Sequence, residues 1–208
     1  MDRLWYASYG SNMALERLTC YLAGGCPPGA ARTYVGARDP SPPADERPVA
    51  LDGSVYFAWQ SPTWGGGIAF YDPDAAGTSF GRAYLLTLEQ LSDLAAQEMH
   101  RDPGEDLDLT ELLSVGCSVV GPGRYEALHV VGALDEVPVI TFTSPRRLHE
   151  VDHNPPTAAY LALMATGLVE GHGWGPDEVC DYLLARPGIG RWNRDSLTPL
   201  VPGSPALD

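Results

Sequence analysis

Lysine is absent from the 208-residue chain, and all 13 basic residues are arginine. This absence excludes chemistry that needs a lysine amine, including Schiff-base formation and the phosphate-binding P-loop. No run of about 18 apolar residues occurs, which argues against a membrane-spanning helix. The four cysteines have no CxxC or other metal-like spacing, so we expect reduced thiols and no metal site.

Positive charge is also scarce, because 13 basic residues stand against 27 acidic ones and the net charge is −14. A surface this acidic repels phosphate backbones and anionic lipids, so we expect no nucleic-acid and no membrane partner. No basic stretch followed by an apolar segment opens the chain, which predicts a cytoplasmic protein. The composition, with arginine as the only basic residue besides histidine and with many glycines and prolines, suggests a GC-rich bacterial genome.

The length and an apolar content of 44% suit one domain over residues 1–208, with 199–208 as a flexible tail. Strand-like runs are separated by turn residues, and helical spacing follows them. We expect strands at 4–9, 33–35, 49–51, 55–59, 67–71, 82–87, 125–132 and 137–143, and helices at 13–22, 88–101, 107–113, 157–170 and 176–185. Short connections favour an α+β fold with a mixed, curved, barrel-like sheet, flanking helices and a C-terminal helical pair.

Two segments match catalytic signatures without the required structural context. His149-Glu150-Val151-Asp152-His153 matches HExxH, the zinc-peptidase motif, but prolines at 145 and 155 leave room for about two helical turns at most. We interpret it as part of a polar loop over 144–156. Residues 77–81 match GxSxG, but a turn precedes them and a strand follows, so we interpret them as a hairpin loop.

The first candidate site is the glycine turn Tyr9-Gly10-Ser11-Asn12-Met13, between the first strand and the first helix. Backbone N–H groups of such a turn point outward together and can bind an anion. The alternative is a tight turn in which Asn12 caps the following helix.

The second candidate is Glu98, in the helix expected over 88–101. The apolar stripe of this helix runs to Leu94, and Glu98 continues it four residues later, whereas Gln90 and Asp93 are expected on the solvated face. A carboxylate on a buried face is costly unless it is paired, hydrogen-bonded or protonated, and such a group suits proton transfer. The alternative is that Glu98 lies at the exposed edge of the stripe.

With these features, the sequence resembles the γ-glutamylcyclotransferase family. The resemblance rests on the segment 5–13 (WYASYGSNM), the segment 64–69 (WGGGIA), the helix that ends in Gln97-Glu98, and the stretch 155–170. It implies that the glycine loop holds a γ-glutamyl group, that Glu98 is the catalytic acid/base and that a tyrosine lies in the pocket. The substrate-binding residues that the resemblance implies are Tyr9, Gly10, Ser11, Asn12, Met13, Ala14 and Tyr125.

One departure concerns the leaving-group side of the pocket. The family usually has another tyrosine shortly before the final helices, but no tyrosine occurs between Tyr125 and Tyr160, and the loop 144–156 is longer. The identity of the leaving amine therefore stays open.

The resemblance implies a cyclising lyase or acyltransferase reaction. The free α-amine of a γ-glutamyl amide attacks its own γ-carbonyl, which releases 5-oxoproline and a free amine or amino acid. Because the nucleophile belongs to the substrate, the reaction needs no cofactor. The expected partner is a small-molecule γ-glutamyl substrate, and the oligomeric state stays open, with a homodimer among the alternatives. A non-catalytic binder of γ-glutamyl or amino-acid ligands is the second hypothesis, and a zinc peptidase is the third.

Overall fold

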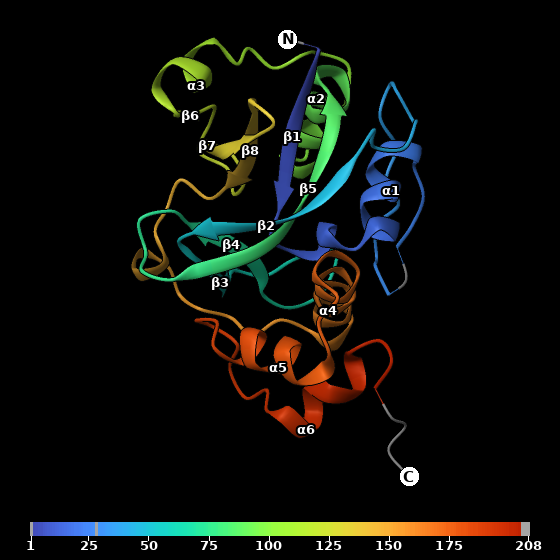
Figure 1. Ribbon diagram of the computed structural model, residues 1–208, viewed down its shortest axis with the longest axis vertical. Helices are drawn as coiled ribbons and strands as arrows, with labels where there is room; N and C mark the ends of the chain where they lie inside the picture. Colours follow the sequence, from blue (N-terminus) through green and yellow to red (C-terminus); the bar gives the residue numbers. More distant parts are fainter. Residues whose placement is uncertain (1, 28, 205–208) are drawn as a thin grey trace.

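The computed structural model describes residues 2–27 and 29–204, and within these ranges one six-stranded sheet has the order β2-β5-β1-β8-β7-β6 (Figure 1). Strands β1 and β8 pair in parallel, and the other neighbours pair antiparallel. A separate β3–β4 hairpin packs beside this sheet. The strands are β1 (Arg3–Ser8), β2 (Glu46–Asp52), β3 (Ser54–Ala58), β4 (Ile68–Asp72), β5 (Thr78–Thr87), β6 (Cys117–Val119), β7 (Ala127–Leu134) and β8 (Val137–Thr143).

Helices cover the sheet from two directions. They are α1 (Leu15–Ala23), α2 (Leu88–Glu98), α3 (Thr110–Val115), α4 (Ala158–His172), α5 (Pro176–Leu184) and α6 (Arg194–Leu197). Figure 1 shows α4, α5 and α6 gathered at the end of the molecule opposite the N-terminus, whereas α1 and α2 lie beside the strands β1 and β5. This arrangement confirms the α+β class with a mixed, curved sheet, flanking helices and a C-terminal helical pair.

Strand β1 is central because both of its faces are buried. Trp5 and Ala7 pack into the apolar cluster that α4 and α5 share, whereas Leu4 and Tyr6 pack into the cluster beneath α1 and α2. Side chains alternate between the two faces of a strand, so a strand that is covered on both faces has a continuous apolar sequence. The run LWYAS therefore marks the strand at the middle of the fold.

The differences from the expected elements lie mostly in short or irregular segments. The strand expected at 33–35 is only an isolated bridge between Tyr34 and Gly25, and β6 and α6 were not expected. Within the expected tail, Thr198–Leu200 forms a 3₁₀ helix and Val201 is buried, whereas 205–208 lie outside the described residues.

The HExxH and GxSxG segments do not have the structural context that their catalytic signatures require. In the HExxH segment only Leu148–Glu150 forms a 3₁₀ turn, and His153 pairs with Ala58 in an isolated bridge, so the two histidines do not share a helical face. In the part of the chain that the structure describes, no three His, Cys, Asp or Glu side chains are grouped to hold a metal ion. Ser79 of the GxSxG segment is buried near the start of the long strand β5, so the segment is not a nucleophile elbow. The expected hairpin loop is wrong, because residues 78–81 belong to β5, and the preceding strand β4 pairs with β3 and not with β5.

No helix among the described residues has the length and apolar character that a membrane crossing requires.

Candidate active site

The glycine turn leaves the end of β1 and forms a short 3₁₀ helix, Ser11–Met13, before α1 begins. The expectation that Asn12 caps the first helix is wrong, because Ala14 occupies the N-cap position and the Glu170 carboxylate accepts from the Leu15 N–H of α1 at 3.1 Å. Gly10 is in close contact with α4, since a Cβ atom there would lie 3.0 Å from the Tyr160 hydroxyl. The Asn12 side chain is therefore free for another role.

That role is a contact with Glu98. The Asn12 Nδ2 atom donates to the Glu98 Oε1 atom at 2.7 Å and to the Tyr6 hydroxyl at 3.3 Å. Glu98 lies in the last turn of α2 and is partly buried, which is between the buried face that was expected and the exposed edge that was the alternative. Residues 86 positions apart in the sequence thus meet at the glycine turn.

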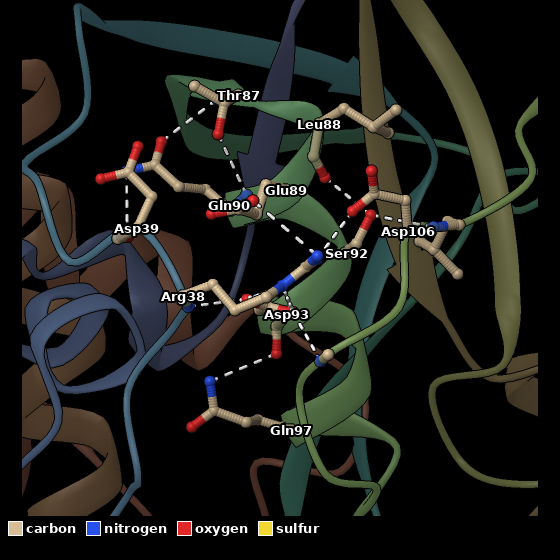
Figure 2. A network of polar contacts seen from close by, with 12 residues as sticks. Arg38, Asp39, Thr87, Leu88, Glu89, Gln90, Ser92, Asp93, Gln97 and Asp106 are labelled. Carbon is tan, nitrogen blue, oxygen red and sulfur yellow. Dashed lines mark hydrogen bonds and ion pairs between the residues drawn. The ribbon is translucent and has the colours of Figure 1, made fainter.

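Helix α2 is held in place by polar contacts that Figure 2 shows along its outer face. The Asp93 carboxylate accepts from the backbone N–H of Arg38 at 2.7 Å, from the Arg38 Nε atom at 2.9 Å and from the backbone N–H of Gly104 at 3.0 Å. A capping box begins α2, since Thr87 and Gln90 bond to each other's backbone N–H groups.

The expectation that Gln90 and Asp93 are solvated is wrong, because both are buried under two irregular segments, near 38–41 and 102–107. Neither segment has a periodic pattern that would have revealed this cover. The segments fix α2, and with it Glu98, against the rest of the fold.

Glu98 and the glycine turn line one cavity that is open to solvent. Of the expected substrate-binding residues, Tyr9, Gly10, Ser11, Asn12 and Tyr125 line it. The other lining residues are Tyr6, Ser8, Arg17, Tyr21, Arg32, Tyr34, Ser61, Pro62, Thr63, Trp64, Ile68, Ala69, Gln97, His100, Arg124, Phe142 and Tyr160.

Met13 and Ala14 are not among the lining residues and are completely buried. The Met13 carbonyl accepts from the Tyr84 hydroxyl at 2.6 Å and from the Arg82 Nη1 atom at 3.1 Å. In this structure, Met13 and Ala14 lie behind the cavity wall, where they hold the glycine turn in place.

Three tyrosines of the wall are neutral hydrogen-bonding groups. Burial, together with the nearby Glu98 charge, raises the pKa of Tyr160 to about 12, and burial raises the pKa of Tyr9 and of Tyr125 well above the ordinary value. The Tyr9 and Tyr125 hydroxyls donate to the carbonyls of Phe142 and Ala69 at 2.8 and 2.9 Å. None of the three is a base at neutral pH, and Glu98 is the acidic residue among the described residues that line the cavity, beside the imidazole of His100.

Several wall residues were missed by the sequence reasoning. Arg32 and Arg124 come from irregular segments whose sequences do not predict a spatial position. Arg17 carried a usable signal, because it lies four residues before Tyr21 on the apolar face of the first helix, and a charged residue on such a face is unusual. The same argument singled out Glu98.

Comparison with solved structures shows which known fold this chain has. No family model matches the chain. A solved structure of a γ-glutamyl cyclotransferase superimposes with a TM-score of 0.53 at 15% identity, covering 95% of this chain and 99% of that one. A human structure described as the uncharacterized protein loc79017 gives a TM-score of 0.53 at 16% identity, covering 96% and 99% of the two chains. The chain has the γ-glutamylcyclotransferase fold.

One curated relative is similar in sequence. Histone deacetylase 5 of Arabidopsis thaliana is 30% identical over 198 residues, a match that covers 86% of this chain. The chain spans only 30% of the length of that plant protein. A match to less than a third of a protein does not carry the activity in its name to this chain.

Proposed function

We propose that the protein is a γ-glutamylcyclotransferase that converts a γ-glutamyl amide into 5-oxoproline and a free amine. The observation that carries this proposal is the 2.7 Å contact between Asn12 and Glu98, in a cavity that the glycine turn also lines. This contact puts a proton-carrying carboxyl group beside a loop whose backbone amides can bind an anion. The fold supports the same activity.

In the proposed reaction the α-amine nitrogen bonds to the γ-carbonyl carbon of the same substrate, and the amide bond from that carbon to the leaving nitrogen breaks. Glu98 accepts a proton from the attacking amine and donates it to the leaving nitrogen, so it ends the cycle in its starting state. The folded substrate brings nucleophile and carbonyl together, and such intramolecular reactions reach effective molarities on the order of 10⁵ M or more.

The glycine turn would stabilise the negative charge that develops on the γ-carbonyl oxygen. The first hydrogen bond inside the turn runs from the Met13 N–H to the Gly10 carbonyl at 3.1 Å. The amides of Ser11 and Asn12 therefore precede the bonded part of the turn, and the first amides of any helical turn lack partners within it. Such preorganised donors stabilise an oxyanion effectively where water is excluded.

The test is mass spectrometry of mixtures that contain the protein and a panel of γ-glutamyl compounds, with dipeptides, amines and larger amides as leaving groups. We expect stoichiometric 5-oxoproline and free amine from at least one member. Tight binding of a panel member without product would favour the non-catalytic binder instead. Activity that disappears with a metal chelator and returns with zinc would favour the peptidase hypothesis.

A further inference from the structure

Arg17 is a buried cation without an anionic partner. Its side chain is 2% exposed, and its Nη2 atom donates to the hydroxyls of Tyr21 and Tyr34 at 2.9 and 2.7 Å. The guanidinium carbon lies 4.2 and 4.3 Å from the centres of these two rings. The Nε and Nη1 atoms are buried and have no hydrogen-bond partner. Aromatic rings stabilise the charge in part, but they do not satisfy its N–H donors.

A second buried arginine, Arg82, has carboxylate and carbonyl partners for its guanidinium group. Arg82 is 5% exposed, and it donates to the carboxylates of Glu46 and Glu170 and to the Met13 carbonyl. Charged groups in protein interiors are normally paired in this way. Arg17 is equally buried, yet it forms no ion pair with any described residue. The Glu98 carboxylate acts on Arg17 only from beyond ion-pair distance, so the unused donors are available to an anionic ligand.

The unpartnered atoms gather at the cavity. Among the described residues, six buried side-chain nitrogen or oxygen atoms lack a partner, and four of them belong to Asn12, Arg17 and Gln97, which all line the cavity. Two are the Arg17 donors, and two are acceptors, the Asn12 Oδ1 and Gln97 Oε1 atoms. Cationic donors near amide acceptors are complementary to a group that bears both a carboxylate and an amine.

The charge of the cavity wall is opposite to that of the molecule. The whole chain has a net charge of −14, but the wall contains Arg17, Arg32 and Arg124 and only one acidic residue, Glu98. A concave site lined by one sign of charge raises the local concentration of ligands with the opposite sign. The wall therefore favours an anionic substrate despite the acidic surface.

We propose that Arg17 binds the α-carboxylate of the γ-glutamyl group and so selects substrates that have a carboxylate on the carbon bearing the attacking amine. This inference rests on the proposed function. Binding of that carboxylate by Arg17 would point the neighbouring amine toward Asn12, Gln97 and Glu98. The Nη2 atom already donates to Tyr21 and Tyr34, so the carboxylate would accept from the free Nε or Nη1 group, donor positions that a lysine amine lacks.

The test compares two amides with the same leaving amine, a γ-glutamyl amide and the corresponding 4-aminobutanoyl amide, which has the amine but no α-carboxylate. In Arg17→Gln we expect the KM for the γ-glutamyl amide to rise roughly 10- to 100-fold, as for a lost hydrogen bond to a charged group. The kcat/KM for the 4-aminobutanoyl amide should stay within about threefold of wild type, because that substrate never uses the guanidinium. Equal losses on both substrates would show a structural role and would overturn the inference.

Two further substrates test the position of the carboxylate. They are γ-glutamyl compounds whose leaving amines differ only in carrying or lacking a carboxylate. The substitution should affect both to the same extent. A loss confined to the substrate with the charged leaving group would place the anion on the leaving side and would contradict the proposal.

Calorimetric binding of 5-oxoproline and of 2-pyrrolidinone separates this inference from the proposed function. We expect wild type to prefer 5-oxoproline and Arg17→Gln to lose that preference. Arg17-dependent binding without turnover would refute the cyclotransferase activity and leave the anion site in place. Turnover without dependence on Arg17 would support the cyclotransferase activity and refute the anion site. A wild-type protein that neither binds nor turns over these compounds would refute both claims.

Controls address folding. Arg191→Gln removes the same charge from an exposed position and should change nothing. If Arg17→Gln does not fold, Arg17→Lys keeps the charge but has no counterpart of the free Nε and Nη1 donors. It should raise the KM for the γ-glutamyl amide selectively, and an unselective loss would again count against the proposal.

Discussion

Asn12 connects the two parts of the candidate site. Its amide nitrogen donates to Glu98 and to the Tyr6 hydroxyl, so it fixes the carboxyl group relative to the glycine turn. A proton carrier must lie within hydrogen-bond reach of the atoms it serves, and small displacements lower the rate strongly. We therefore assign Asn12 a positioning role in addition to its place on the cavity wall.

For Asn12→Ala we expect kcat to fall roughly 10- to 100-fold, because the Glu98 carboxyl group loses its fixed orientation. Steady-state kinetics on a γ-glutamyl amide measures this effect. Asn193→Ala is the matched control, since Asn193 caps α6 through the Ser196 N–H at 3.0 Å, outside the cavity wall. The control should lose about 1 kcal/mol of stability with no change in kcat. An unchanged kcat in Asn12→Ala would contradict the positioning role.

The sequence singled out Glu98 and Asn12 on different grounds. Glu98 followed from helical periodicity, because an acidic residue on an apolar stripe needs a partner. Asn12 was predicted as a possible helix cap, but a 3₁₀ turn intervenes and its side chain points to Glu98 instead. That partner is 86 residues away, and local sequence contains no information about such a contact.

Among the secondary-structure elements, α2 determines where the acidic group lies. Two irregular segments are bonded to its outer face through Asp93, which is completely buried, and through Arg38, which also pairs with Asp106 at 2.7 Å (Figure 2). The Gln97 Nε2 atom donates to the Tyr21 carbonyl at 3.0 Å and so ties α2 to α1. The last turn of α2 therefore has little freedom to move.

Asp93→Asn should lower the free energy of unfolding by about 2–4 kcal/mol, because it leaves the Arg38 guanidinium without its buried partner. Urea denaturation measures this change. An exposed pair offers the control, since Asp177→Asn removes the 2.8 Å contact with Arg194 and should cost less than about 1 kcal/mol. Equal effects of the two substitutions would show that the Asp93 network does not anchor the helix.

Sequence patterns predicted the long, periodic elements and failed where the chain is irregular. Helix α2 was recognisable from its apolar stripe, and the strand pairs from their turns. The segments that cover α2 have no periodicity, so the burial of Asp93 and Gln90 was not predictable. These segments obtain their structure from the surface on which they lie.

Across the whole molecule, histidines make stability depend on pH. Burial lowers the pKa of His129 and of His172, and burial with the nearby Arg32 charge lowers that of His100. The unfolded chain binds protons near the ordinary value of about 6.5, before the folded protein does. The stability that these histidines contribute is therefore complete above about pH 6.5. It is lost as the pH falls from that value through the lowered pKa values of the folded protein.

We expect the free energy of unfolding to be lower at pH 5.5 than at pH 7.5, in a window above most carboxyl titrations. His172→Gln should reduce this difference, because burial lowers the pKa of His172 by more than its contact with the Gly81 carbonyl raises it. His149→Gln, at an exposed position, is the control and should leave the difference as in wild type. A pH dependence that is identical in all three proteins would contradict the assignment.

The central claim is that this cavity cyclises γ-glutamyl amides with Glu98 as the proton carrier. The most direct measurement is 5-oxoproline release by wild type and by Glu98→Gln, together with the substrate affinity of each. Glutamine keeps an oxygen that can accept from Asn12 but cannot carry the proton. The account predicts that kcat falls by about a hundredfold or more while affinity changes by no more than a few fold. A Glu98→Gln protein that releases 5-oxoproline at a near-wild-type rate would contradict it.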